Sequence, residues 1–286
     1  MPNQNLEAAL RGFMTDWQND LTPAWRGVLA GVSPAFDDIR EDLLLRDDER
    51  IYPGRKGQLL PNAPQGAEVF RALARVAPSA VRAVVIGQDP YPRIERATGR
   101  AFEQGDVSSW TAPGAGIATS LKRLLQITAF HRTGDATFLV DGAGWQKVSA
   151  QLSSGALTIE TPAKLFNRWE DQGVIFLNAA LTISRYVEGG GPEQAYGHIP
   201  MWRPIIHRIL QFLVGRNPGQ VVFLTWGAYA RRVLKSSGVD KLPGWGTRAD
   251  AATYAHPATA AFLLPPNPFA KANEVLERLG GERIEW

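Results

Sequence analysis

Short runs rich in β-branched residues alternate along the chain with stretches of helical periodicity, and this alternation strongly limits the folds open to it. The apolar runs cover residues 81–86, 174–177, 221–224 and 253–254. The helical stretches cover residues 6–17, 67–76, 117–130, 202–214, 228–234 and 272–279. Strands that alternate with helices favour a mainly parallel sheet with helices on both faces. The sequence therefore predicts an α/β fold in three layers, with a central, mainly parallel four-stranded sheet flanked by helices.

Polar side chains follow three of the predicted strands. The first strand leads into Asp89, the second into Asn178 and the last into His256. In open parallel sheets, ligands bind beyond the carboxyl ends of the strands, so we expect these three side chains to converge on one site. Taken alone, each has a plainer explanation: an Asp-Pro turn, an amide that caps a strand, and a loop histidine.

The absence of cysteine limits the chemistry of that site. It excludes disulfides, thiol catalysis and cysteine-ligated zinc or iron–sulfur centres. The histidines are His131, His198, His207 and His256, and no two of them stand at the short spacing of metal ligands. We therefore expect a site that uses neither a metal nor a cofactor.

The charge balance is mildly basic. The 286 residues include 31 Lys and Arg against 28 Asp and Glu, a formal charge of +3. This total permits a local nucleic-acid-binding patch, and it fits an ordinary mixed-charge surface equally well. No apolar run approaches the length of a membrane span, and the first residues lack the pattern of a secretory signal. We expect a monomer that is cytoplasmic and nucleoid-associated, with no membrane partner.

The chain reads as one large domain with an added N-terminal segment. Residues 1–50 predict a helical extension, and residues 51–286 carry the strands and helices of the α/β domain. The stretch 135–162 matches none of the predicted elements, and we interpret it as an insertion in that domain.

Motifs at the strand ends are similar, in content and in order, to those of the family 1 uracil-DNA glycosylases. Gly-Gln-Asp-Pro-Tyr matches the family's water-activating motif, and Phe102 follows Asp89 at the family's spacing of thirteen residues. The other segments resemble its uracil-reading strand, its third strand with the helix start, and its leaving-group histidine motif. In chain order, the four segments are residues 87–91, 176–182, 222–230 and 256–257. The resemblance runs from about residue 52 to residue 286.

The resemblance implies a DNA glycosylase that hydrolyses the N-glycosidic bond of uracil and leaves an abasic site for base excision repair. Because a base inside a duplex is out of reach, the nucleotide is flipped into a pocket. Bond cleavage leaves positive charge on the sugar and negative charge on the uracil. The implied role of Asp89 is to orient water and stabilise the sugar cation. The implied role of His256 is to donate to uracil O2 as a neutral imidazole.

The resemblance also implies which residues read the base and contact DNA. The Asn178 amide pairs with O4 and N3–H of uracil, and Phe102 stacks on the base. Tyr91 packs against C5, where thymine carries its methyl group, and the Gln88 backbone contributes to O2. The implied DNA contacts are Ser120, Pro257, Ala258 and Ala260.

The loop before Phe102 and a later segment depart from the family pattern. Pro92 replaces the histidine that normally follows the tyrosine, and Arg93, Arg96 and Arg100 make this loop more cationic than usual. Residues 111–116 replace the family's proline-rich loop, which pinches the DNA backbone.

The residue that would fill the gap left by the flipped base also differs. The family has a leucine four residues after the histidine, where this chain has Ala260. An alanine is too short to fill such a gap, so either Phe262, Leu263 or Leu264 takes over or duplex invasion is weak. Because unstacking costs less in a single strand, we expect uracil in single-stranded DNA to be the better substrate.

Two other functions remain open at this point. The altered loops leave room for a glycosylase that acts on another modified base in DNA, although Tyr91 argues against bulky C5 substituents. The other is a non-catalytic DNA-binding module on the same scaffold. The joint presence of Asp89, Asn178 and His256 argues against a module, because a carboxylate beside a phosphate backbone does not help binding. The leading prediction is a uracil-DNA glycosylase whose partner is DNA that contains uracil.

Overall fold

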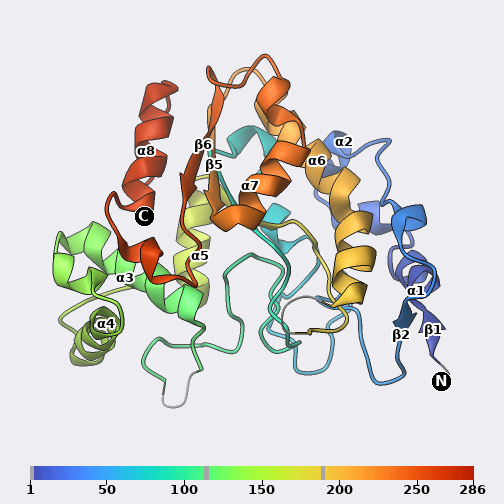
Figure 1. Ribbon diagram of the computed structural model, residues 1–286, viewed down its shortest axis with the longest axis horizontal. Coiled ribbons are helices and arrows are strands. Elements are labelled where there is room, and N and C mark those ends of the chain that lie inside the picture. The colour runs from blue at the N-terminus through green and yellow to red at the C-terminus, as the bar shows by residue number, and fades with distance from the viewer. Residues whose placement is uncertain (1–2, 113–115, 188–190) are drawn as a thin grey trace.

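A central sheet of parallel strands organises the molecule (Figure 1). The computed structural model describes residues 3–112, 116–187 and 191–286. Within these ranges, four parallel strands pair in the order β4-β3-β5-β6. Their bounds are Ala83–Gly87 for β3, Val174–Asn178 for β4, Val221–Trp226 for β5 and Ala249–Tyr254 for β6. The predicted parallel four-stranded sheet is confirmed.

Helices cover both faces of the sheet and complete the three layers, as predicted (Figure 1). Successive strand residues point to opposite faces, so Val84 and Phe223 pack with one set of helices and Val85 and Leu224 with the other. The first set is α1 (Leu6–Phe13), α2 (Pro23–Val28), α6 (Ile199–Gly215) and α7 (Gly227–Ser236). The second set is α3 (Thr119–Thr133), α4 (Ala143–Ser154), α5 (Pro162–Asp171) and α8 (Pro268–Arg278). Among the described helices, none has the length and apolarity needed to cross a membrane.

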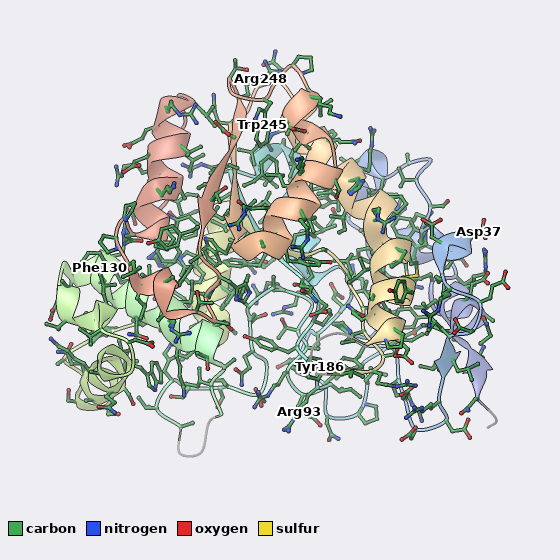
Figure 2. All side chains as sticks on the ribbon, in the orientation of Figure 1. Asp37, Arg93, Phe130, Tyr186, Trp245 and Arg248 are labelled. Atoms are coloured by element: carbon green, nitrogen blue, oxygen red, sulfur yellow. The ribbon has the colours of Figure 1, made fainter. Side chains whose placement is uncertain are left out.

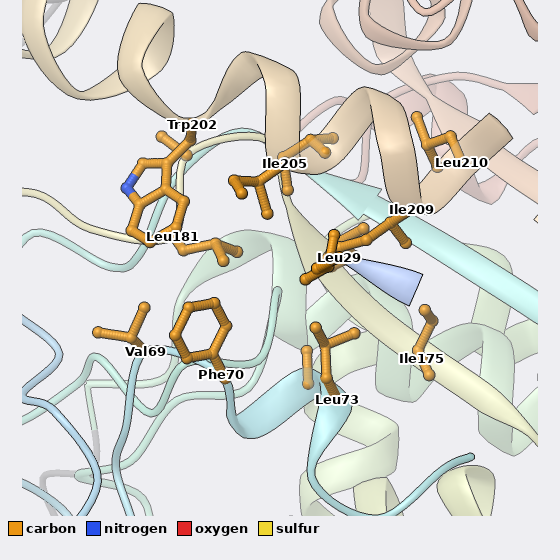
Figure 3. Packing of buried hydrophobic residues seen from close by; sticks show 14 of the residues in the cluster. Leu29, Val69, Phe70, Leu73, Ile175, Leu181, Trp202, Ile205, Ile209 and Leu210 are labelled. Atoms are coloured by element: carbon orange, nitrogen blue, oxygen red, sulfur yellow. The ribbon is translucent and has the colours of Figure 1, made fainter. Parts of the chain in front are cut away.

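The first core runs without a break from the N-terminal residues to the sheet. Figure 3 shows Ile205 and Ile209 of α6 beside Leu29, with Ile175 of β4 in the same cluster. A short antiparallel ribbon, β1 (Gln4–Asn5) with β2 (Leu44–Leu45), precedes and follows the N-terminal helices and was not predicted. The helices within residues 1–50 therefore share their hydrophobic core with the rest of the chain.

Residues 135–162 pack against α3. A 3-10 turn, Ala136–Leu139, and then α4 follow α3 along the chain. Phe138 and Val148 are buried in the same cluster as Leu124 of α3, and the Gln126 amide donates to the Phe138 carbonyl over 2.7 Å. Buried contacts thus tie this stretch to the second helical layer.

The predicted helix at residues 67–76 is wrong. In the described chain, a 3-10 turn at Arg71–Leu73 takes its place. The backbone N–H of Glu68 donates to the Thr98 carbonyl, and that of Val69 donates to the Gly54 carbonyl. Because these tertiary partners take the groups that would begin a helix, local propensity is overridden. The other predicted helices are present, although their ends differ by a few residues and α1 is shorter than predicted.

Candidate active site

The carboxyl ends of the strands open onto a cavity of about 440 Å³. Figure 2 shows Arg93 and Tyr186, from loops at this end, on the side of the molecule opposite to Trp245 and Arg248, which precede β6. Seven residues predicted from the sequence line this cavity: Gln88, Asp89, Tyr91, Phe102, Ser120, Asn178 and His256. The structure therefore brings the predicted catalytic and base-reading side chains together.

Asp89 is a half-buried carboxylate that two side-chain amides hold just beyond β3. Gln88 Nε2 and Gln194 Nε2 both donate to Asp89 Oδ2, over 3.2 and 3.1 Å. Burial raises the pKa of Asp89 to about 6, and the two amide donations act in the opposite direction because they favour the charged form. Asp89 is therefore ionised at neutral pH and takes up a proton as the pH falls through about 6.

The Asn178 amide borders the cavity without a protein partner. Asn178 is 2% exposed, and its side chain makes no hydrogen bond within the described residues. It pairs in register with Gly87, where a Cβ would lie 2.2 Å from Asn178 Oδ1, so only glycine leaves room for it. A buried amide without hydrogen-bond partners lowers the stability of the fold, and a ligand that hydrogen-bonds to it removes this penalty. The position therefore suits recognition of a planar group that offers a donor beside an acceptor.

Phe102 reaches the cavity from a strained turn. Its φ of +64° lies in the left-handed region, which costs a non-glycine residue roughly 1–2 kcal/mol. The adjacent N–H of Ala101 donates to the Phe176 carbonyl of β4 over 2.9 Å, which docks the turn on the sheet. The ring centroid of Phe102 lies 5.4 Å from that of Trp226 and 6.2 Å from that of His256. The turn thus presents an aromatic ring beside the histidine.

A buried ion cluster holds this turn. The Arg100 side chain is fully buried and donates to both oxygens of Glu103, over 2.8 and 2.6 Å. It also donates to Glu170 of α5 over 2.7 Å and to the Asn167 amide oxygen over 2.8 Å. Because Arg100 and Glu103 flank Phe102, these contacts hold the strained turn from both sides.

Two of the three arginines that were expected to make the loop cationic are neutralised. Arg100 is paired within the cluster, and Arg96 pairs with Asp106 over 2.9 Å. Arg93 is exposed, and among the three it is the one without a carboxylate partner in the described residues. Among these three arginines, the unpaired positive charge is therefore that of Arg93.

The ring of His256 is neutral, with its proton on Nε2. The backbone N–H of Ala258 donates to His256 Nδ1 over 3.1 Å, and a nitrogen that accepts carries no proton. Within the described residues nothing accepts from Nε2, so Nε2–H is free to donate. Partial burial lowers the pKa of His256, which also favours the neutral form. Gly227 has a φ of +84°, and a Cβ there would lie 2.8 Å from His256 Cβ, so glycine lets the histidine approach α7.

Tyr91 and Ser120 form one wall of the cavity. Their hydroxyl oxygens lie 3.3 Å apart, which fixes the Tyr91 ring relative to α3. Ser120 stands in the first turn of α3, where unpaired backbone N–H groups favour an anion such as a phosphate. This position is compatible with the predicted DNA contact of Ser120.

The loop after His256 leaves one leucine exposed. A 3-10 turn, Ala260–Leu263, buries Phe262 and Leu263, which are 0% and 3% exposed. Leu264 is 60% exposed, and the Tyr254 hydroxyl donates to its carbonyl. Of the three predicted replacements for the family leucine, only Leu264 is exposed, and Phe262 and Leu263 are buried.

The remaining predicted DNA contacts differ in accessibility. Ala258 and Ala260 are exposed, whereas Pro257 is buried and its carbonyl accepts from Arg123 of α3 over 3.2 Å. Within the segment 111–116, residues 113–115 lie outside the described residues.

Two features of the site went unrecognised in the sequence. Gln194, which bonds Asp89, lies in a π-helical turn, Gln194–His198, that no predicted strand or motif leads into. Arg100 was expected to make its loop more cationic, and arginine is seldom fully buried. Its pairing with Glu170, far along the chain, has no local signal.

A larger cleft, of about 860 Å³, lies at the opposite ends of the strands. Val81, Gly173 and Gln220, which precede β3, β4 and β5, line it, and none of the predicted site residues does. Of the arginines that line it, Arg82 and Arg216 donate to backbone carbonyls and Arg75 pairs with Asp171. Because these cations already have partners within the protein, the smaller cavity remains the candidate for chemistry.

Curated relatives match nearly the full chain. The uracil-DNA glycosylase of Coxiella burnetii is 30% identical over 272 residues, which cover 93% of this chain and 94% of that protein. The uracil-DNA glycosylase of Deinococcus radiodurans is 25% identical over 271 residues, which cover 95% of this chain and 86% of that protein. No family model matches the chain.

Solved structures share the fold. The UNG protein of Nitratifractor salsuginis superposes with a TM-score of 0.60 at 22% identity, covering 95% of this chain and 96% of that chain. The uracil-DNA glycosylase of mimivirus has a TM-score of 0.57 at 16% identity, covering 99% of this chain and 93% of that chain. These structures support the three-layer α/β architecture.

Proposed function

This chain belongs to the uracil-DNA glycosylase family, and we propose that it hydrolyses the N-glycosidic bond of uracil in DNA at the cavity bordered by Asp89, Asn178 and His256. The product is an abasic site for base excision repair. The observation that supports this proposal most is the meeting of these three side chains, from three strand ends, around one cavity.

The cavity provides each part of uracil recognition. We infer that a uracil flipped out of DNA stacks on Phe102, with its O4 and N3–H edge at the open amide of Asn178. The donor–acceptor order of that edge is reversed in cytosine, and an amide held in the orientation that uracil requires would then be left unpaired at a cost of about 1–3 kcal/mol. Tyr91, held by Ser120, closes the space beside C5.

The polar groups then stabilise the charges that form as the bond breaks. The C1′–N1 bond breaks and its electron pair passes to uracil, whose O2 accepts from His256 Nε2–H. The carboxylate of Asp89 stabilises the cationic sugar and takes a proton from the water that attacks C1′. Both groups are in the required protonation state at neutral pH, since Asp89 is ionised and His256 is neutral. Preorganised charges of this kind contribute on the order of 3–4 kcal/mol each.

The test is incubation with matched oligonucleotides that carry uracil, thymine or 5-hydroxymethyluracil, followed by alkaline cleavage of abasic sites. We expect strand cleavage with the uracil oligonucleotide alone. Cleavage of the 5-hydroxymethyluracil strand in preference to the uracil strand would instead identify a glycosylase for another modified base.

The Tyr91→Ala variant should admit thymine, because it removes the ring that we propose to fill the space beside C5. We expect measurable thymine release, while uracil release changes less than about tenfold. The measurement is single-turnover excision from oligonucleotides that differ by this one methyl group. The matched control is Tyr91→Phe, which keeps the ring and loses the hydroxyl contact to Ser120. Thymine release by both variants, or by neither, would remove Tyr91 from this role.

The Leu264→Ala variant should slow excision from duplex DNA by about ten- to a hundredfold, because an inserted leucine contributes roughly 1.5–3 kcal/mol through burial. Excision from single-stranded DNA should be unchanged, since it leaves no stacked gap to fill. The measurement is the ratio of single-turnover rates on matched single- and double-stranded substrates. Leu59, also 60% exposed, does not line the cavity, so Leu59→Ala is the control. Equal ratios in the wild type and Leu264→Ala would mean that this leucine does not enter DNA.

A further inference from the structure

The two oxygens of the Asp89 carboxylate have different surroundings. Gln88 Nε2 and Gln194 Nε2 both donate to Oδ2. Within the described residues, no group donates to Oδ1. A carboxylate held through one oxygen has a fixed orientation, and its second oxygen is left for a ligand or water.

Of the two amides, Gln194 is the one that the fold holds in place. Gln88 is exposed, whereas Gln194 is 5% exposed and its Oε1 is buried without a hydrogen-bond partner. Because a carboxylate only accepts, the Gln194 amide must turn Nε2 towards Asp89, and Oε1 accepts from no protein group within the described residues. The Gln194 amide is thus oriented by the carboxylate of Asp89.

The turn that carries Gln194 is anchored from its other end. His198 closes the π-helical turn and is fully buried between the hydroxyls of Thr182 and Ser184, at 2.9 Å from each. Trp202 of α6 donates to the same Thr182 hydroxyl over 2.7 Å. π-Helical turns are rare and frequently lie at functional sites. Here the turn sets the position of the amide relative to β3.

A second cavity, of about 330 Å³, meets Asp89 from this side. Gln88, Asp89 and Tyr186 border both cavities, and Gln194 and Arg185 border the second one. None of the base-facing residues Phe102, Asn178 and His256 lines it. Hydrolysis needs water at C1′ of the sugar, on the face away from the departing base. Because the Asp89 carboxylate borders both cavities, it can act on the base side of the sugar and on the water side.

We propose that Gln194 is a positioning residue that holds Asp89 through Oδ2, so that Oδ1 receives the hydrolytic water from the side of the second cavity. This inference rests on the proposed function. It adds a residue that does not touch the substrate and acts through the orientation of the carboxylate.

The first test is Gln194→Met, which keeps the length of the side chain and removes its donor. We expect kcat for uracil release to fall about tenfold with KM within about twofold, because a misplaced general base loses rate and not binding. The acid limb of the pH–rate profile should move to higher pH. The amide donation lowers the pKa of Asp89, so its loss lets that pKa rise.

Other ionisable groups around Asp89 do not account for such a shift. Tyr52, Tyr91 and Tyr229 stay uncharged because burial raises the pKa of each phenol. The other charged or titratable groups that line the two cavities are the guanidinium groups of Arg96, Arg100 and Arg185, the phenol of Tyr186, and His256, whose pKa lies below its usual range. All of them are unchanged in the variant.

Two further variants separate positioning from mere support of the fold. Tyr196→Phe changes an exposed residue of the same turn and should leave both kcat and the acid limb unchanged. Gln194→Glu places a second carboxyl beside Asp89, so the pKa of Asp89 should rise further than in Gln194→Met. A fall in kcat without any shift of the acid limb, or a shift of equal size in Tyr196→Phe, would overturn the proposal.

The pKa of Asp89 can also be followed directly, by ¹³C NMR of the carboxyl carbon in aspartate-labelled protein, with Asp89→Asn identifying the signal. A higher pKa in Gln194→Met supports the contact, and an unchanged pKa overturns it. This readout does not depend on uracil release. Failure of the proposed function and failure of the present inference are therefore distinguishable.

Discussion

Asp89→Asn and His256→Ala should each slow uracil release by at least about a hundredfold, because each removes a group aimed at charge that develops as the bond breaks. The asparagine variant keeps the shape of the side chain and loses the negative charge that stabilises the sugar cation. The alanine variant loses the Nε2–H that donates to uracil O2. Single-turnover rates measured with enzyme in excess isolate this chemical step.

Both variants are expected to fold. A neutral amide at residue 89 costs less to bury than a carboxylate whose pKa burial raises to about 6, and its oxygen can still accept from Gln194. His256 is exposed at the cavity rim. Thermal midpoints close to the wild type would show that a slow variant has lost chemistry and not structure. A folded variant that releases uracil at nearly the wild-type rate would remove that residue from its assigned role.

Wild-type activity should fall as the pH drops through about 6, because protonation removes the charge of Asp89. The same acid limb should be absent from the residual activity of Asp89→Asn.

Arg100→Leu should destabilise the folded state by about 3–5 kcal/mol, because it leaves Glu103 and Glu170 buried without their main partner. The free energy of unfolding, obtained from urea titration, measures this loss. Arg96→Leu is the matched control in the same loop. Its pair with Asp106 is partly exposed, with 22% and 31% of the two side chains accessible, so its loss should cost no more than about 1 kcal/mol.

The stability deficit of Arg100→Leu should shrink as the pH is lowered from the alkaline range to about 7 and stay level below it, because Glu170 of the wild type also takes up a proton at about pH 7. Burial raises the pKa of Glu170 to about 7, and Arg100 acts in the opposite direction, so removing Arg100 raises that pKa further. The folded variant then holds a proton that the unfolded chain releases at a pKa of about 4.3. Under these conditions stability rises as the pH falls. A small loss in the free energy of unfolding of Arg100→Leu, or a loss that grows as the pH falls, would contradict a stabilising role for the pairing of Arg100 with Glu103 and Glu170.

The sheet and the meeting of the site residues were predictable because they follow from local patterns. The strands β3, β4 and β5 are buried apolar runs, and β6, which is partly buried, was located by its last two residues, Thr253 and Tyr254. Parallel strands end at the same edge of the sheet, which is enough to bring Asp89, Asn178 and His256 together. The family resemblance added the roles of Tyr91, Phe102 and Ser120, which stand on loops and a helix start that no periodicity locates.

The features that escaped prediction all depend on contacts between distant segments. The helix predicted at residues 67–76 fails because Thr98 and Gly54 take its first N–H groups. Arg100 is neutralised by Glu170, which lies on α5, and Gln194 reaches Asp89 from a turn beyond β4. Likewise, the exposure of Leu264 beside the buried Phe262 and Leu263 depends on how the loop packs against the core. Local sequence patterns do not predict such contacts between distant residues.

The most direct test of the central claim is the quantity of free uracil released by the wild-type protein from an oligonucleotide with a single uracil. Released base would be measured by chromatography in the presence of excess EDTA, beside oligonucleotides with thymine or cytosine at the same position. The proposed function predicts one uracil for each abasic site formed, no release of thymine or cytosine, and no loss of activity in EDTA. Release that depends strictly on a metal ion, or the absence of free uracil when the protein is folded, would contradict it.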